Sequence, residues 1–197
     1  MSKLVYTALM SLDGFTEDLD GRFDWAMPDE ELHAFVNGLG REVGTELYGR
    51  KMYETMAVWE DVRDEPGTHP VEVEFADQWR GLDKVVYSTT LASVWTPRTR
   101  LEREFDPTAV RRMKDESGHD LSVSGPTLAQ HAFRAGLVDE VHLFVFPVVV
   151  GGGTPALPRD ARFALELVDE RRFGNGAVHL HHRVLPAATE GSSQPAT

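Results

Sequence analysis

The sequence predicts an α/β fold, in which helices flank a central, mostly parallel sheet and an antiparallel hairpin lies at the C-terminus. Two observations predict the parallel part: β-prone segments alternate with segments of helical periodicity, and crossover helices connect parallel strands. A third predicts the hairpin, because β-prone segments flank the turn sequence Gly174-Asn175-Gly176. No linker interrupts the chain, so we expect a single domain over residues 1–185.

Each expected strand is a short apolar, β-prone run that ends at turn residues. The first precedes the turn Asp13-Gly14, and the longest ends at Gly151-Gly152-Gly153. The expected strands cover residues 3–10, 46–48, 84–88, 120–123, 141–150, 163–172 and 178–185. Residues 186–197 lack apolar bulk, and we expect them to form a disordered tail.

The expected helices carry recognisable start signals. Pro28 is followed by three acidic residues, which favour a helix N-terminus, and apolar residues then recur at helical spacing up to Gly40. Gly125-Pro126 opens another helix, which ends near Gly136. We expect helices over residues 28–39, 71–79, 107–114 and 125–136, and a short one that ends at Met56.

Composition excludes several classes of function. The chain has no cysteine, which excludes disulfides, thiolate metal sites and cysteine nucleophiles. Its net charge of −12 disfavours binding to nucleic acid or to an anionic membrane. No signal peptide is evident, and the apolar run over residues 144–150 is too short to span a bilayer. We therefore expect a cytoplasmic protein that acts on a small molecule.

Three expected strand-to-helix junctions carry residues suited to a phosphate. Ligands of open α/β sheets bind at the carboxyl ends of strands, where glycine permits close approach and helix N-termini offer free amides. The junctions are Tyr48-Gly49-Arg50-Lys51, Ser88-Thr89-Thr90 and Ser124-Gly125-Pro126-Thr127. Each also has a plain structural interpretation, as a turn, a cap or a helix start. No G-x-G-x-x-G, phosphate-loop or G-x-S-x-G motif is present.

The order of several motifs resembles a known family. In chain order they are Ser11-Leu12-Asp13-Gly14, Gly49-Arg50-Lys51 with Tyr53-Glu54, Lys84-Val85-Val86-Tyr87-Ser88, Ser124-Gly125 with Leu128, Gly136-Leu137-Val138-Asp139-Glu140 and Pro147-Val148-Val149-Val150-Gly151-Gly152-Gly153. Over residues 3–185 the chain resembles the dihydrofolate-reductase-like superfamily, and more closely the reductase-domain family of bacterial riboflavin biosynthesis. The resemblance implies an NADPH-dependent oxidoreductase that forms a homodimer.

The resemblance also implies where NADPH would lie. The adenosine-side phosphates would meet Gly49, Arg50 and Lys51, with Arg50 as the partner of the 2′-phosphate. The adenosine would lie between Ser88, Thr89 and Thr90, and the pyrophosphate against Ser124, Gly125, Pro126, Thr127 and Leu128. Ala8, Leu9, Asp13 and Phe15 would lie near the nicotinamide. Relatives have a cis peptide at the position of Ser124–Gly125, so we expect one here.

Reduction of a C=N or carbonyl group also needs a proton donor. Folate reductases of the resembled superfamily carry a carboxylate just after a proline on the first helix, and Asp29, Glu30 and Glu31 follow Pro28 here. All three acids also simply favour a helix start. Asp13 is a further candidate, for which a turn role is equally open. Phe15 and Trp25 are candidates for the substrate pocket.

Departures from the family pattern leave the substrate open. Met52 replaces a threonine that donates to phosphate, and Gly81-Leu82-Asp83 lacks the arginine that holds folate. Three hypotheses follow: a reductase of a small heterocycle or a ribosylamino-pyrimidine, a true dihydrofolate reductase, or a non-catalytic nucleotide-binding dimer. His179 and His181 share a strand face, but no carboxylate is evident beside them in the sequence, so we expect no metal site.

Overall fold

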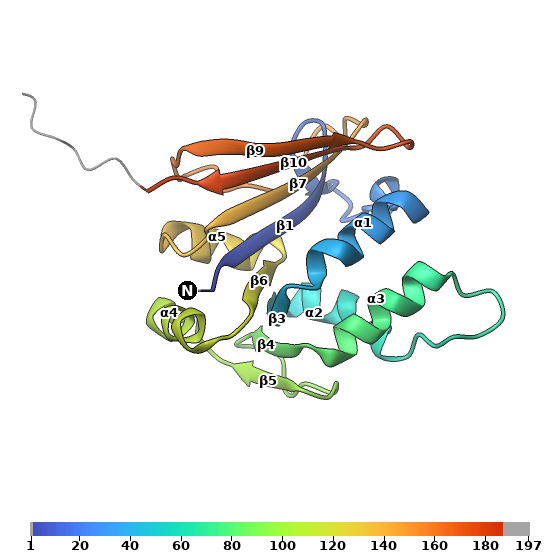
Figure 1. Cartoon of the computed structure of the whole chain (residues 1–197). Helices are drawn as coiled ribbons and strands as arrows, with labels where there is room; N and C mark the ends of the chain where they lie inside the picture. Colours follow the sequence, from blue (N-terminus) through green and yellow to red (C-terminus); the bar gives the residue numbers. More distant parts are fainter. Residues whose placement is uncertain (1, 187–197) are drawn as a thin grey trace, which may run out of the picture.

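The structure, a computed structural model, describes residues 2–186 and confirms the α/β class (Figure 1). One sheet has the strand order β5-β4-β3-β6-β1-β7-β10-β9. Its strands are β1 Leu4–Ser11, β3 Val43–Gly49, β4 Asp83–Tyr87, β5 Thr99–Glu102, β6 Asp120–Ser124, β7 Glu140–Phe146, β9 Leu165–Arg172 and β10 Val178–Val184. Two short strands, β2 Phe15–Glu17 and β8 Thr154–Pro155, pair with each other apart from it.

Pairing in the large sheet is parallel from β5 to β7. Strand β10 then pairs antiparallel with β7 on one side and with β9 on the other, which confirms the predicted C-terminal hairpin. The first strand of the chain, β1, lies in the middle of the sheet between β6 and β7. Because parallel neighbours point the same way, the carboxyl ends of β4, β3, β6 and β1 lie along one edge.

Helices cover both faces of the sheet (Figure 1). On one face are α1 Glu30–Gly40, α2 Arg50–Met56 and α3 Pro70–Gly81; on the other are α4 Pro107–Glu116 and α5 Pro126–Arg134. Single 3-10 turns, η1 Asp24–Ala26 and η2 Ala57–Glu60, precede α1 and follow α2. The predicted helices are therefore all present, and α3 and α4 extend slightly beyond the predicted ranges.

The helix starts follow from their sequences. The Asp29 side chain caps α1 by accepting a hydrogen bond from the Leu32 amide at 3.0 Å, and Asp106 caps α4 in the same way. Helices α3, α4 and α5 each begin with proline, whose missing N–H is not needed in the first turn. Helix α5 ends before Gly136, which has a φ of 61°.

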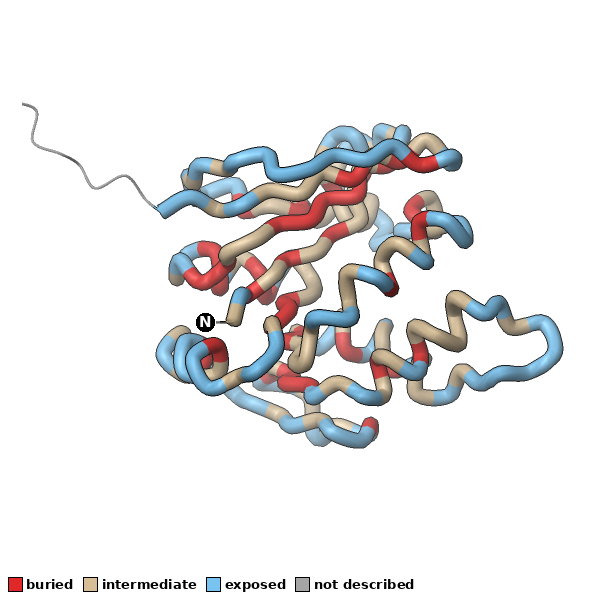
Figure 2. Tube along the Cα trace, in the orientation of Figure 1, coloured by how far each residue is buried: buried red, intermediate tan, exposed pale blue. Residues whose placement is uncertain are grey.

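Burial is greatest in the central strands and decreases toward the edge strand β9 and the loop before α3 (Figure 2). On the α5 face, the aromatic ring of Tyr6 packs edge-on against Phe133 at 5.4 Å between ring centroids. On the α1 face, Leu32 is fully buried against a cluster that includes Phe144 and Phe173. Because successive side chains of a strand point to opposite faces of the sheet, the central strands β1 and β7 contribute apolar side chains to the clusters on both faces.

Some predicted boundaries are wrong. The strand expected over residues 141–150 ends at Phe146, because Pro147 has no N–H for the ladder and Val148 bonds back to the Phe146 carbonyl at 2.8 Å. Strand β5 was not predicted, since Thr-Arg-Leu-Glu is too polar to read as a strand. Apart from residue 186, the predicted disordered tail lies outside the described residues. Within residues 2–186, no helix has both the length and the apolarity to cross a bilayer.

Candidate active site

The three junctions singled out in the sequence lie side by side at one edge of the sheet. Strands β4, β3, β6 and β1 are consecutive neighbours. Gly49 at the end of β3 pairs with Tyr87 of β4, and Tyr48 pairs with Ser124 of β6. The segments that follow these strands therefore open onto the same side of the molecule. This gathering agrees with the position expected for a ligand of an open α/β sheet.

The N-terminus of α5 is the most clearly built part of this edge. The first intrahelical bond runs from the Ala129 amide to the Gly125 carbonyl at 3.1 Å, so the amides of Thr127 and Leu128 precede the helical ladder. Gly125 has a φ of 91°, and a Cβ there would lie 3.1 Å from the Cβ of Met52. No larger residue fits this turn without strain. Such a turn can bring amides close to an anion.

One expectation about this turn is wrong. We expected a cis peptide between Ser124 and Gly125, but no cis peptide occurs among residues 2–186. The glycine accommodates the turn instead through its positive φ, a conformation that L-residues with a side chain rarely adopt.

Arg50 and Lys51 supply positive charge at the first turn of α2. Both side chains are largely exposed, and their ion pairs are long: Arg50 Nε lies 3.9 Å from Glu54, and Lys51 Nζ lies 3.6 Å from Glu17. Exposed pairs at such distances contribute little to stability. The two cations can therefore turn toward an anionic ligand at low cost.

The Ser88 junction has a structural role of its own. The Ser88 hydroxyl accepts hydrogen bonds from the amides of Thr90 and Leu91, at 3.2 and 3.0 Å. Arg103 donates to the carbonyls of Ser88 and Leu91 and holds the turn from outside. Thr89 and Thr90 are exposed at the tip. These bonds fit the cap interpretation, and they leave the two threonines accessible.

The residues expected near the nicotinamide and substrate lie around the end of β1. Ala8 is buried and Leu9 partly buried, on opposite faces of β1. Phe15 is buried on β2, and the guanidinium of Arg159 lies 5.1 Å from its ring centroid. Trp25 is partly buried and packs edge-on against Phe146. Their contacts with the core show packing roles for these side chains.

The acidic candidates are exposed, and three of the four are engaged by neighbours. Asp29 caps α1, and Glu30 is exposed beside it. Glu31 accepts from Arg171 at 2.8 Å and from the Gly174 amide, contacts that hold its pKa below the usual range. Asp13 accepts a hydrogen bond from the Gly151 amide at 2.8 Å and so holds the loop after β7 in place. The Ser11 hydroxyl and these loop amides lower the pKa of Asp13. Carboxylates with lowered pKa are poor proton donors near neutrality.

A different carboxyl group, that of Glu46, has a raised pKa. It lies on β3 directly opposite Ser122, on the sheet face that α1 and α3 cover. The Ser124 hydroxyl donates to its Oε2 at 3.2 Å. Burial raises the pKa of Glu46 to about 7, against the opposing effect of the Ser124 and Ser122 hydroxyls. Glu46 thus places a proton near neutrality directly behind the Ser124–Gly125 turn.

The sequence carries one sign of Glu46. The segment Glu46-Leu47-Tyr48 predicts a short strand, and Glu46 is a charged residue within it. A strand between helices is usually apolar on both faces. A charged residue inside such a strand therefore stands out, and its neighbours across the sheet are the serines Ser122 and Ser124.

The fold and this edge of the sheet define a dihydrofolate-reductase-like α/β protein. A family model described as the RibD C-terminal domain matches residues 2–179. The chain therefore belongs to the RibD C-terminal domain family, and this membership supports an oxidoreductase. A Bacillus subtilis protein named YyaP, described as uncharacterized, is 28% identical over 180 residues, which cover 90% of this chain and 93% of YyaP.

Solved structures share the fold at low identity. A proposed riboflavin biosynthesis protein from Shewanella sp. PV-4 matches with a TM-score of 0.72 and 18% identity, over 93% of this chain and 99% of that one. A pyrimidine reductase-like protein from Corynebacterium diphtheriae matches with a TM-score of 0.64 and 13% identity, over 94% of this chain and 93% of that one. A Thermotoga maritima deaminase and 5-amino-6-(5-phosphoribosylamino)uracil reductase matches with a TM-score of 0.65 and 12% identity. The match covers 93% of this chain but only 57% of the Thermotoga chain.

Proposed function

We propose that this protein is an NADPH-dependent reductase that transfers a hydride to a small heterocycle, with a ribosylamino-pyrimidine as the leading substrate class. The observation that carries the proposal is the gathering of Arg50, Lys51 and the N-terminus of α5 at one sheet edge, in a member of the RibD C-terminal domain family. In a chain with a net charge of −12, local cations and free amides are needed to hold a phosphorylated ligand.

The residues at this edge fit NADPH. Gly125 leaves room for a close approach to the α5 amides, and these would hold the pyrophosphate. Arg50 would take the 2′-phosphate, because a guanidinium can donate two parallel hydrogen bonds to it. The exposed Thr89 and Thr90 would border the adenosine, and the end of β1 would border the nicotinamide. NADPH would supply the hydride when bound.

We assign the proton to Glu46. Reduction of a C=N or carbonyl group adds a hydride to carbon and a proton to the heteroatom, and the proton donor works best when its pKa is near the working pH. The pKa of about 7 at Glu46 meets this condition. The Ser124 hydroxyl connects Glu46 to the turn that would hold the pyrophosphate. Strand β6, which carries Ser124, is the neighbour of β1, whose end would border the nicotinamide.

The test begins with binding. The protein is titrated with NADPH and NADH by cofactor fluorescence, and then assayed for NADPH oxidation with a ribosylamino-pyrimidine and with dihydrofolate. We expect NADPH to bind more tightly and the pyrimidine to be reduced. Turnover of dihydrofolate alone would identify a folate reductase. Tight NADPH binding without any turnover would favour a non-catalytic nucleotide-binding protein, and no NADPH binding would refute the proposal.

We also propose a cytoplasmic homodimer. The resemblance to riboflavin-pathway reductases supports a dimer, and the absence of cysteine suits a reducing compartment. Sedimentation of the purified full chain gives its mass directly. A monomer at micromolar concentration would contradict the dimer.

A further inference from the structure

Four ionisable side chains cluster on β7 and β10, away from the candidate active site. His142 of β7 lies directly opposite His181 of β10. Glu140 lies two residues before His142 on β7, and His179 lies two residues before His181 on β10. Residues two apart on a strand share a face, so all four project from the face that α1 covers. Glu140 is the first residue of β7, and the cluster therefore lies toward the amino ends of the parallel strands.

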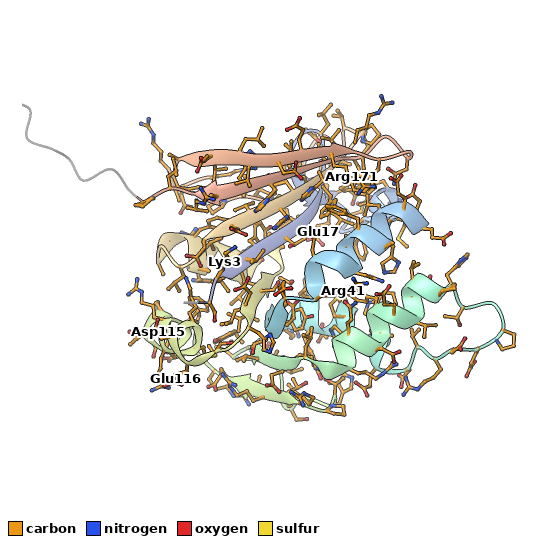
Figure 3. All side chains as sticks on the ribbon, in the orientation of Figure 1. Lys3, Glu17, Arg41, Asp115, Glu116 and Arg171 are labelled. Carbon is orange, nitrogen blue, oxygen red and sulfur yellow. The ribbon has the colours of Figure 1, made fainter. Side chains whose placement is uncertain are left out.

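Figure 3 shows this separation. Lys3, which pairs with Glu140, lies at the amino end of β1, whereas Glu17 follows the carboxyl end of β1. Glu17 is the partner of Lys51 at the candidate active site. The reductase proposed above uses none of the residues in the Glu140–His142–His181 cluster.

The cluster is buried to an unusual degree for such polar groups. His142 is 6% exposed and His179 is 1% exposed. Burial of an imidazole or a carboxylate is costly unless its polar atoms are satisfied. Yet the Nε2 atom of His181 has no well-aligned hydrogen-bond partner within residues 2–186, although it lies 3.2 Å from the Oε2 atom of Glu140. Two lone-pair atoms at that distance repel each other unless a proton or a cation lies between them.

We propose that Glu140, His142 and His181 form a binding site for a divalent metal ion of the zinc type. Each residue offers one ligand atom, and the three atoms all lie within 4.8 Å of one another. Two imidazoles and one carboxylate are a familiar zinc ligand set. Tetrahedral coordination at about 2.1 Å places ligand atoms roughly 3.4 Å apart. The 3.2 Å between His181 and Glu140 already approaches that spacing.

The surrounding contacts prepare the three ligands. The His142 Nδ1 atom is hydrogen-bonded to the His179 Nε2 atom at 2.9 Å, which fixes the ring and leaves His142 Nε2 for a metal. Lys3 holds the other carboxylate oxygen, Oε1 of Glu140, at 2.9 Å.

One feature must change when the metal binds. The rings of His142 and His181 are stacked, with centroids 4.2 Å apart and planes 13° apart. Nitrogen lone pairs lie in the ring plane, so nearly parallel rings do not both point at one ion. A rotation about the Cβ–Cγ bond of His181 opens the stack without moving the backbone. Since β7 and β10 are bonded neighbours, the bound ion would clamp the C-terminal hairpin to the parallel sheet.

The test uses the full chain without a histidine tag, stripped with EDTA and then dialysed free of it. Titration with Co²⁺ is followed by visible absorption, because tetrahedral Co²⁺ absorbs far more strongly than octahedral Co²⁺. Titration with Zn²⁺ is followed by calorimetry and by the unfolding temperature. We expect one equivalent to bind, with an intense Co²⁺ band and a higher unfolding temperature in Zn²⁺.

Three variants locate the site. H181N and E140Q each remove one ligand, and we expect each to weaken Zn²⁺ binding by more than about tenfold. The matched control is H182N, which alters the next residue of β10 on the opposite face and should bind as the wild type does. Circular dichroism in EDTA verifies that each variant is folded.

Two outcomes would overturn the proposal. The first is the absence of stoichiometric Co²⁺ or Zn²⁺ binding by folded wild-type protein, which would leave a proton-mediated pair between Glu140 and His181. The second is metal binding that H181N and E140Q leave unchanged, which would place the ion elsewhere. Since no step uses NADPH, neither result depends on the proposed reductase activity.

Discussion

Replacement of Glu46 by glutamine tests the role proposed for this partly buried carboxyl group, because its effects on stability and on turnover can be measured separately. Burial raises the pKa of Glu46 to about 7 in the folded protein, from an ordinary value of 4.5. Below pH 4.5 the group is protonated in both the folded and the unfolded state, and it imposes no cost. As the pH rises toward 7 the unfolded chain ionises first, so the folded state loses stability and then levels off above pH 7.

The size of this effect follows from the same pKa values. The difference corresponds to about 3 kcal/mol as an upper limit. Glutamine keeps the shape and cannot ionise, so E46Q should be more stable than wild type at pH 8 by up to about 3 kcal/mol, and nearly equal to it at pH 4.5. For a chain of this length that is roughly 6 to 12 °C in the midpoint of thermal unfolding.

The assay is thermal unfolding of wild type and E46Q at pH 4.5, 6 and 8, with NADPH oxidation measured on the same samples. E116Q is the matched control, because Glu116 is exposed at the end of α4 (Figure 3), and its stability should match wild type at each pH. We expect E46Q to gain stability and lose turnover. Equal destabilisation of E46Q at all three pH values would refute the burial argument, and unchanged turnover would remove Glu46 from catalysis.

Three further substitutions test other parts of the structure. R50A should weaken NADPH binding by about ten- to a hundredfold while NADH binding stays within about twofold, since a charge-assisted hydrogen bond is worth about 1.5 to 3 kcal/mol; equal losses in fluorescence titration would contradict the role of Arg50. G125A should lower the free energy of unfolding in urea by about 1 to 3 kcal/mol, because of the positive φ and the nearby Met52. It should also weaken NADPH binding. An unchanged free energy of unfolding would mean that the turn adjusts to the added methyl group. E31Q should leave turnover within about twofold of wild type, since Glu31 is exposed and paired with Arg171; a large loss of rate would restore Glu31 as a catalytic candidate.

Periodicity and turn residues predicted most of the fold. The central strands are mostly apolar and β-prone, and Pro28, Pro126 and the Gly174-Asn175-Gly176 turn mark their elements clearly. Edge strands are harder to predict from the sequence, because an edge strand such as β5 needs few apolar residues. Its residues Thr99–Glu102 gain their strand conformation from pairing with β4, which is a tertiary effect.

The candidate site was predicted in part. The junction residues could be found because glycine, proline and cations have strong local meanings. The proposed proton donor could not be predicted, because the acids at a helix start look equally suitable until the structure shows that neighbours hold two of them, Asp29 and Glu31. Glu46 gains its raised pKa from burial, and burial is visible only once the chain is folded. The same reason hid Glu140, which lies 3.2 Å from His181, and the structure thereby corrects the expectation that no carboxylate lies beside His179 and His181.

The central position of β1 has a consequence for how this chain is made. Its two neighbours, β6 and β7, begin at Asp120 and Glu140, so β1 leaves the ribosome with no sheet partner until β6 has followed. From the end of β1 at Ser11 to the end of β6 at Ser124 is 113 residues, so at about 5 to 20 residues per second the interval lasts roughly 6 to 23 s. During it, the apolar segment Leu4–Ser11 is open to chaperones and to the same segment of other nascent chains. Slower translation between β1 and β6 would lengthen this exposure, and the yield of folded protein in the cell would then depend on the choice of codons between these two strands.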